Sequence, residues 1–183
     1  PVTSGRIEVF GQDVAAQDLG ELRARIAAVF QEPHLFSGTV RENIAYADAD
    51  ASDERVRAAA QAAYAHRFVA AFDDGYEQVI GERGLRLSGG QKQRLALAGV
   101  IAMGADILIL DEPTANLDPR GRDEVIAAVD RVCRRTGATL IVVEHDEDTI
   151  AASDWVVDIG PGAGEHGGHV VHAGPLAELL TSE

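Results

Sequence analysis

Two adjacent carboxylates close a short apolar run in the middle of the chain, Ile107-Leu-Ile-Leu-Asp-Glu112. The four apolar residues predict a buried strand, and a strand that ends in acids delivers them to the edge where open α/β sheets bind ligands. At such an edge Asp111 can hold a magnesium ion while Glu112 orients or deprotonates an attacking water, as in phosphoryl transfer. A strand that simply runs into an acidic turn explains the same residues, because short motifs have many chance matches.

A second string that could bind phosphate is Leu87-Ser-Gly-Gly-Gln91, which precedes a predicted helix. Its glycines let the backbone approach a phosphate closely, and Ser88 adds a hydroxyl donor. The start of a helix also favours negative charge through its free amides and its dipole. The alternative is a Ser-Gly-Gly turn that only caps the helix. A third candidate is His145, although a lone histidine beside a strand is usually structural.

These residues need a sheet and helices to hold them, and the hydrophobic pattern predicts both. Strand-sized segments rich in Val, Ile and Leu alternate with longer helical stretches, which predicts an α/β fold with a mostly parallel sheet and flanking helices. Ser52 is a suitable N-cap for a helix that we expect to continue to about Phe72. The predicted strands are 6–10, 26–30, 107–110, 140–143, 155–159 and 169–172. The predicted helices are 18–25, 40–45, 52–72 and 91–103, with others that start at 119 and 175.

The composition limits the classes of protein to consider. The chain has 183 residues, of which 46% are hydrophobic, and it can bury one sizeable core. Its formal net charge of -14 disfavours direct binding to nucleic acid or to acidic lipid surfaces. A single cysteine, Cys133, excludes an intrachain disulfide and a CxxC zinc module. The apolar runs are far shorter than the roughly 20 residues that a membrane-spanning helix requires.

Four motifs of this chain, taken in order, resemble those of the ATP-binding cassette (ABC) ATPase family. The four are Gln31, the string 87–91, the run 107–112 and His145. The resemblance covers nearly the whole chain and implies a P-loop NTPase-type ABC fold, here incomplete. Residues 1–183 would form one partial ATPase domain, with a helical signature lobe at about 52–103 within it. The implied cofactors are ATP and Mg²⁺.

The resemblance also implies roles for single residues. Glu112 would be the base, and His145 the catalytic switch that reads the γ-phosphate. Asp111 and Gln31 would hold the magnesium ion. The residues implied in nucleotide binding are Gln31, Ser88, Gly89, Gly90, Gln91 and Asp118. Among these, Ser88 and the two glycines would contact the γ-phosphate held by an opposite subunit. Asp118 would lie in the loop that crosses the dimer interface.

Partners and location are implied by the same resemblance. Two such domains would sandwich two ATP molecules head to tail, and their closure would drive transmembrane transporter domains and hence solute transport. Gln31 and Glu82 would contact those membrane domains, Glu82 as part of the string Gly75-Tyr-Glu-Gln-Val-Ile-Gly-Glu-Arg-Gly84. We therefore expect a cytoplasmic location at the inner face of the cell membrane and no nucleic-acid partner.

One motif of the family has no match in this sequence. The loop GxxxxGK[ST] cradles the phosphates of ATP with its amides and its lysine. The single lysine of this sequence, Lys92, belongs to the signature segment instead. Residues 1–10 resemble the family's segment on the C-terminal side of that loop, so we expect the chain to start a short way downstream of it. We expect ATP hydrolysis by a complete domain and negligible ATP affinity in this chain alone.

The resemblance changes subfamily along the chain. Residues 29–94 are similar to exporter-type transporters, and 97–119 to importers of vitamins and metal ions. From Val142 onward, including Asp158-Ile-Gly-Pro-Gly-Ala-Gly164, the chain is similar to the bacterial excision-repair ABC ATPase. Two alternatives to a transporter ATPase stay open: a DNA-repair ATPase, which the charge and the single cysteine disfavour, and a non-hydrolysing partner that supplies only the signature surface. Apart from His145, the acidic residues 144–148 are interpreted as a solvated helix start.

Overall fold

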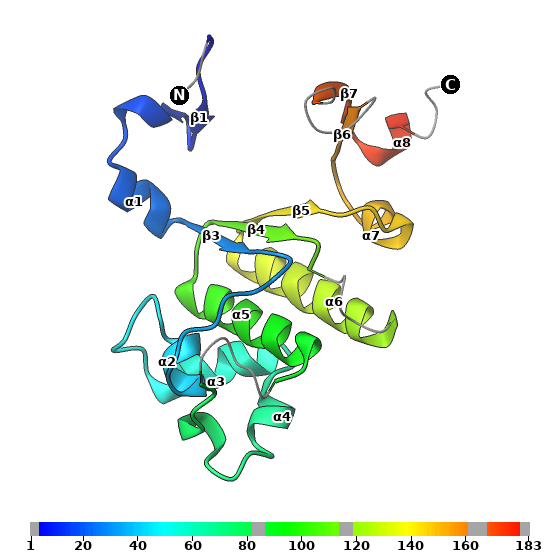
Figure 1. Cartoon of the computed structure of the whole chain (residues 1–183). Helices are drawn as coiled ribbons and strands as arrows, with labels where there is room; N and C mark the ends of the chain where they lie inside the picture. The colour runs from blue at the N-terminus through cyan, green and yellow to red at the C-terminus, as the bar shows by residue number, and fades with distance from the viewer. Residues whose placement is uncertain (1–3, 82–86, 114–118, 161–167, 180–183) are drawn as a thin grey trace. The chain divides into compact units, whose positions relative to one another are not determined.

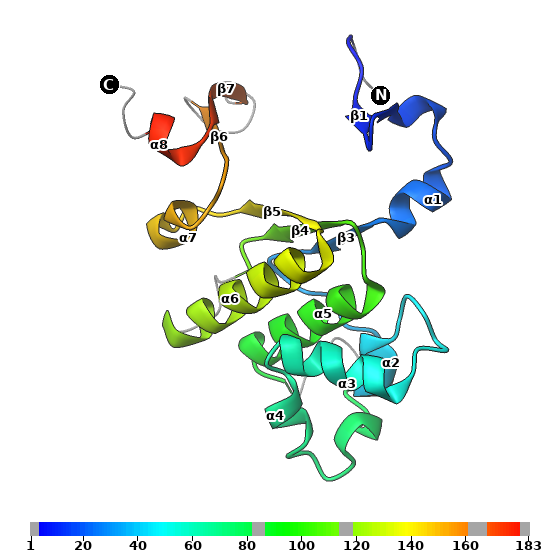
Figure 2. The same cartoon turned by 180° about the vertical axis from the view of Figure 1, so that it is seen from behind.

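The chain is described here from a computed structural model that covers residues 4–81, 87–113, 119–160 and 168–179. The predicted site residues Glu82 and Asp118 lie outside the described residues. The chain divides into two compact units, Pro1–Val143 and Glu144–Glu183, and each is described by itself (Figures 1 and 2). The expectation of a single partial domain over the whole chain stays a prediction.

A three-stranded parallel sheet forms the centre of the first unit. Its strands are β3 (Ile26–Val29), β4 (Ile107–Asp111) and β5 (Thr139–Val143), in the order β3-β4-β5. Backbone pairing places Val29 opposite Leu110, and Leu110 opposite Val142. The predicted strands in this region and the α/β class with a parallel sheet are confirmed. Because parallel strands end at the same edge, the residues that come directly after β3 and β4 meet there.

Two long helices, α5 (Gly89–Met103) and α6 (Pro119–Thr136), cover one face of this sheet (Figure 1). Leu110 in the central strand is fully buried. On β5, by contrast, Ile141 is 47% and Val143 is 54% exposed. Within the described part of the chain, the sheet face that carries these two side chains is therefore open to solvent.

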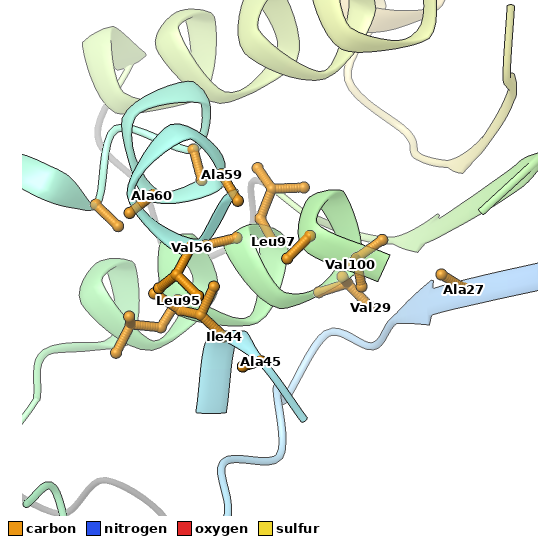
Figure 3. Packing of buried hydrophobic residues seen from close by; sticks show 14 of the residues in the cluster. Ala27, Val29, Ile44, Ala45, Val56, Ala59, Ala60, Leu95, Leu97 and Val100 are labelled. Atoms are coloured by element: carbon orange, nitrogen blue, oxygen red, sulfur yellow. The ribbon is translucent and has the colours of Figure 1, made fainter. Parts of the chain in front are cut away.

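A helical lobe packs against α5 on the side away from the sheet (Figures 1 and 2). Its elements are α2 (Val40–Ile44), α3 (Asp53–Ala62), α4 (His66–Val69) and the short 3-10 helix η2 (Gly75–Glu77). Apolar side chains from β3, α2 and α3 gather around α5, among them Val29, Ile44 and Val56 (Figure 3). One apolar core therefore joins the sheet to the lobe, and α5 runs through its middle.

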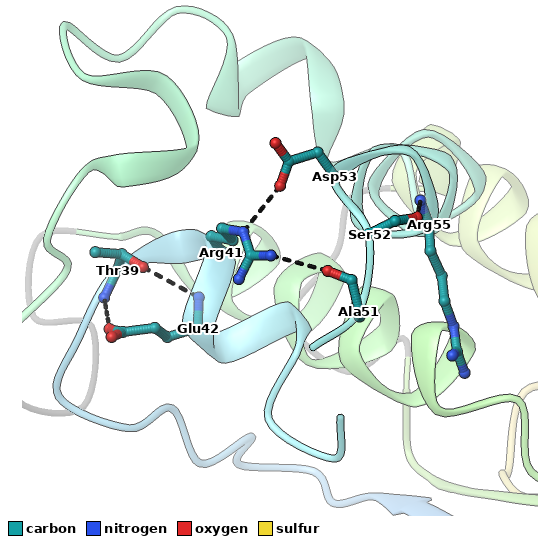
Figure 4. Close-up of polar contacts among 7 residues, drawn as sticks. All are labelled: Thr39, Arg41, Glu42, Ala51, Ser52, Asp53 and Arg55. Carbon is teal, nitrogen blue, oxygen red and sulfur yellow. Dashed lines mark hydrogen bonds and ion pairs between the residues drawn. The ribbon is translucent and has the colours of Figure 1, made fainter. Parts of the chain in front are cut away.

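A capping box and Arg41 stabilise the start of the lobe at α2 (Figure 4). The Thr39 side chain accepts a 3.0 Å hydrogen bond from the Glu42 N–H, and the Thr39 N–H donates a 2.8 Å bond to the Glu42 carboxylate. Arg41 donates to the Asp53 carboxylate at 3.0 Å and to the Ala51 carbonyl at 2.8 Å. These contacts satisfy the first turn of α2 and tie it to the start of α3.

The structure shows that a single helix over 52–72 was a wrong prediction. The first helix ends at Ala62, and a separate one begins at His66. Between them Tyr64 has a left-handed backbone with φ of 53°, which does not fit an α-helix. Ala63 beside it is fully buried, so tertiary packing at this bend overrides the helical propensity of the alanine-rich segment.

The predicted N-terminal strand over 6–10 is shorter than expected. The strand β1 (Glu8–Val9) pairs antiparallel with β2 (Gln12–Asp13) in a small hairpin. Phe10 and Gly11 both have positive φ, so the chain turns back directly after β1. The next elements are the 3-10 helix η1 (Val14–Ala16) and α1 (Leu19–Ala24). The predicted helix over 18–25 is thus confirmed, with Asp18 as its N-cap.

The second unit is small and contains a hairpin between two helices. Its elements are α7 (Glu147–Ala151), β6 (Val156–Gly160), β7 (His169–Gly174) and α8 (Leu176–Leu179). The two strands pair antiparallel, with a register shift between Asp158 and Ile159. The predicted strands in this region and the last helix are confirmed. None of the helices in the described ranges combines the length and the apolar character that crossing a bilayer requires.

Candidate functional site

The acidic pair lies where the sequence predicts it, at the carboxyl end of β4. Asp111 is the last residue of the strand, Glu112 comes directly after it, and both are half-buried. Glu112 has a left-handed backbone with φ of 43°, which is unfavourable for a residue with a Cβ atom. Its N–H donates a 2.9 Å hydrogen bond to the carbonyl of Val143 at the end of β5. Strain that is held in place by surrounding structure is typical of functional sites.

Gln31, which lies two residues after the end of β3, contacts Glu112 of this pair. Because Val29 lies opposite Leu110 in the parallel register, the residue two positions further on lies beside Glu112. The Nε2 of Gln31 donates a 2.6 Å hydrogen bond to Oε2 of Glu112, across 81 residues of sequence. The structure thus brings together Gln31 and Glu112, two of the predicted site residues, with Asp111 adjacent in the chain.

The oxygen atoms at this edge suit a magnesium ion. Carboxylate and amide oxygens are ligands that Mg²⁺ prefers, and an open site lets the ion keep several waters. Asp111 and Gln31 supply oxygens of these two kinds, and Gln31 is exposed. The residues present therefore fit the ion that the family resemblance implies, and their role as its ligands stays a prediction.

The string Leu87–Gln91 caps the start of α5 with its own side chains. Ser88 is the N-cap, because its Oγ accepts a 3.3 Å hydrogen bond from the Gln91 N–H. In return, Oε1 of Gln91 accepts a 3.0 Å bond from the Ser88 N–H. The helix begins at Gly89, two residues earlier than predicted, and Ser88 and Gly89 are exposed. The cap that the sequence offered as an alternative is present, but the Ser88 O–H can still donate, and amides of the first turn have no partner inside the helix.

His145 lies in the second unit, directly before the N-cap of α7. Its side chain is 80% exposed, and its Nδ1 lies 3.9 Å from Oε2 of Glu144. Only 5% of the Glu144 side chain is exposed, and its carboxylate accepts a 3.1 Å hydrogen bond from the His145 N–H. The interpretation of 144–148 as solvated is therefore wrong for Glu144. Its burial has no signal in the sequence, where it is one acid among several.

An exposed aromatic patch, made of His34, Phe36 and Tyr46, was not predicted. The ring centroids of His34 and Phe36 are 5.4 Å apart, and those of Phe36 and Tyr46 are 6.0 Å apart. Phe36 and Tyr46 are both about half exposed. Asn43, which is buried, holds this loop because its amide bonds both the N–H and the carbonyl of Phe36. In the sequence, Phe36 stands next to another apolar residue in a loop, and the sequence pattern does not show which of the two side chains is exposed.

Comparisons with known proteins relate the whole chain to membrane exporters. A family model described as "ABC transporter" matches residues 1–115. The ATP-dependent lipid A-core flippase of Chromohalobacter salexigens is 40% identical over 181 residues, which is 99% of this chain and 30% of the flippase. The putative multidrug export ATP-binding/permease protein YgaD of Bacillus subtilis is 39% identical over 182 residues, which is 100% of this chain and 30% of that protein.

A solved structure gives the same relation at the level of the fold. The structure of a bacterial Atm1-family ABC exporter with ATP bound matches with a TM-score of 0.85 and 36% sequence identity. The match covers 97% of this chain and 30% of the exporter chain. This chain therefore spans less than a third of the length of each of these three relatives.

Proposed function

The chain belongs to the ABC transporter family, and on that basis we propose that it supplies the catalytic edge and the signature helix of an exporter-type nucleotide-binding domain that hydrolyses ATP. Its ABC-type fold is shared with an ATP-bound exporter. The observation that carries the proposal is the contact of Gln31 with Glu112, next to Asp111, at the carboxyl edge of the sheet. An amide and two carboxylates at this edge are parts that phosphoryl transfer from a metal-bound nucleotide needs.

In the proposed reaction Glu112 takes a proton from a water molecule while the water oxygen bonds to the γ-phosphorus. The bond between that phosphorus and the bridging oxygen breaks, and ADP leaves with the electron pair. Asp111 and Gln31 would hold Mg²⁺, which when bound neutralises charge on the phosphate oxygens. Glu112 suits the role of base because it is only half-buried and its backbone is fixed by Val143.

We assign the start of α5 to a nucleotide that is held by a second ABC domain. Ser88 and Gly89 are exposed at the N-terminus of this helix, where amides and the helix dipole favour a γ-phosphate. The residues proposed to bind nucleotide are Gln31, Ser88, Gly89, Gly90, Gln91 and Asp118. His145 is proposed to read the γ-phosphate, and its exposed side chain is compatible with this role.

The proposed partners are a second ATPase domain, arranged head to tail, and transmembrane transporter domains. The aromatic patch supports the second of these, because it offers exposed apolar surface close in sequence to Gln31. Glu82 is proposed to take part in the same coupling. With such partners the chain would act in the cytoplasm, at the inner face of the cell membrane.

We also propose that these 183 residues bind ATP weakly on their own, because they contain no GxxxxGK[ST] loop. Isothermal titration of Mg-ATP into the chain tests this point. We expect no saturable heat of binding, and a clear binding isotherm for the isolated chain would contradict the proposal.

A DNA-repair ATPase is a second candidate, supported by the excision-repair resemblance from Val142 onward. The formal net charge of -14 and the alignment of the flippase with 99% of the chain both weigh against it. Anisotropy of a labelled DNA duplex over a salt series separates the two candidates. Binding at low salt that weakens steeply as salt rises would favour repair.

The transporter proposal is tested by grafting this chain into a flippase. Residues 1–183 replace the aligned residues of the C. salexigens protein, so that any ATP-binding loop outside the alignment stays that of the flippase. Glu112→Gln keeps the side-chain size but cannot take the proton, so turnover should fall by about 100- to 10,000-fold while ATP binding is kept. Glu54→Gln, at an exposed position of α3, is the matched control and should turn over ATP like the parent graft. Unchanged turnover in Glu112→Gln would remove Glu112 as the base. A non-hydrolysing partner would instead show ATP-dependent association without turnover in the parent graft.

A further inference from the structure

The side chain of Gln31 bonds to Glu112 beyond the last backbone pair of β3 and β4. Backbone pairing already joins β3 to β4 and ends with Val29 opposite Leu110. The backbone of Glu112 is anchored separately, by the 2.9 Å bond from its N–H to the Val143 carbonyl. The 2.6 Å bond from Nε2 of Gln31 to Oε2 of Glu112 therefore adds a restraint on the carboxylate that backbone pairing does not supply.

The two polar atoms of the Gln31 amide can serve two different groups. The Nε2 donates to Glu112, while Oε1 accepts no hydrogen bond from any residue that the structure describes. A carboxylate cannot replace this amide, because it has no N–H to donate and would repel Glu112. A role in holding a cation and a role in aiming Glu112 therefore depend on different atoms of Gln31, and substitutions can separate them.

We propose that Gln31 is a positioning residue, whose Nε2–H fixes one oxygen of the Glu112 carboxylate so that the other oxygen receives the proton of the attacking water. The contacts that would hold Glu112 include the backbone bond to Val143 and the bond from Gln31 to its carboxylate. The inference rests on the proposed function, because it takes Glu112 to be the base. The hydrogen bond itself can be measured without any turnover of ATP.

The first experiment measures this hydrogen bond in the 183-residue chain by NMR of the side-chain amides of its seven glutamines. Gln31→Met removes one pair of amide signals and so assigns it. Glu112→Ala should move that pair toward the position of a solvated amide and leave the other pairs in place. Glu32→Ala removes an exposed carboxylate adjacent in sequence and should leave the pair unmoved. A Gln31 signal that does not respond to Glu112→Ala would overturn the proposal.

The second experiment measures turnover in the flippase graft at saturating Mg²⁺. Gln31→Met and Gln31→Glu both lack the N–H donor, and each should lower kcat by about 10- to 100-fold with little change in KM for ATP. Gln31→Glu keeps an oxygen for a cation, so a role in metal binding alone would leave its kcat near that of the parent graft. That result would overturn the proposal.

A double variant distinguishes failure of this inference from failure of the proposed function. When Glu112→Gln is already present, adding Gln31→Met should cause no further loss of turnover, because both changes act through the same carboxylate. A further loss of about tenfold would show that Gln31 acts independently of Glu112 and would overturn the positioning role. Full turnover in Glu112→Gln alone would instead defeat the proposed function, and the NMR result would be unaffected.

Discussion

The acidic edge of the sheet, which carries Gln31 and Glu112, and the start of α5 are assembled in different ways. At the edge, Gln31 and Glu112 are 81 residues apart in sequence and meet because β3 and β4 pair in one register. At the start of α5, Ser88 and Gln91 are three residues apart and cap the helix between themselves. The first arrangement depends on the tertiary fold, and the second depends mainly on local sequence. Mutations should therefore affect the two regions separately.

The largest effect is expected from a change that loosens the central strand. Leu110 is fully buried in β4, and Leu110→Ala should lower the free energy of unfolding by about 2 to 5 kcal/mol. Urea unfolding followed by circular dichroism measures this loss. Leu95→Ala, at an equally buried position of α5, is the control of the same size. Only Leu110→Ala should also shift the Gln31 amide signal. Equal shifts in both variants would contradict the claim that mutations affect the two regions separately.

A smaller change in the free energy of unfolding, of opposite sign, is expected from replacing Gln93, which is buried within α5. Its side chain is 3% exposed, and neither atom of its amide has a hydrogen-bond partner in the described ranges. Because burying an unpaired polar group costs about 1 to 3 kcal/mol, Gln93→Met should stabilise the chain by about 1 kcal/mol. The same urea titration checks this. A loss of stability would mean that the amide has a partner that the described residues do not include.

The local character of the second region is tested at Ser88. Ser88→Ala removes the cap and should cost about 1 kcal/mol of stability. Ser88→Asp keeps an acceptor for the Gln91 N–H and should preserve stability, but it places a negative charge where the γ-phosphate is proposed to bind. In the graft, Ser88→Asp should therefore abolish ATP turnover without unfolding the domain. Normal turnover in this variant would mean that the string only caps the helix.

The smallest effect on stability is expected from releasing the backbone strain at the acidic edge of the sheet. Glu112 has φ of 43°, a conformation that glycine adopts without steric cost. Glu112→Gly should therefore be more stable than Glu112→Ala by about 0.5 to 1 kcal/mol, since both lose the carboxylate and only one keeps a Cβ atom. Urea midpoints of the two variants give the difference. Equal stabilities would show that the surrounding sheet does not impose this conformation.

Much of the fold could be predicted from short-range signals. The apolar run 107–110 predicted β4, and the cap at Ser52 predicted where α3 begins. The prediction failed at Tyr64, where the chain bends so that its neighbours enter the core. Helical propensity contains no information about that packing, and so one predicted helix became two.

The candidate site could be predicted as a set of residues but not as a set of contacts. The family resemblance implied that Gln31 and Asp111 hold one magnesium ion, so these residues were expected to lie together. Their hydrogen bond depends on the register of two strands that are distant in sequence. The burial of Glu144 and the positive φ of Glu112 likewise arise from tertiary contacts and have no local pattern.

The central claim is that the acidic edge of one domain and the signature helix of another act on the same ATP. The most direct test measures the ATP that stays bound to the purified graft after free nucleotide is removed. We predict that Glu112→Gln retains ATP, because the closed state can form but cannot hydrolyse it, and that adding Ser88→Asp releases it. Retention of as much ATP by the double variant, or of none by Glu112→Gln alone, would contradict the account.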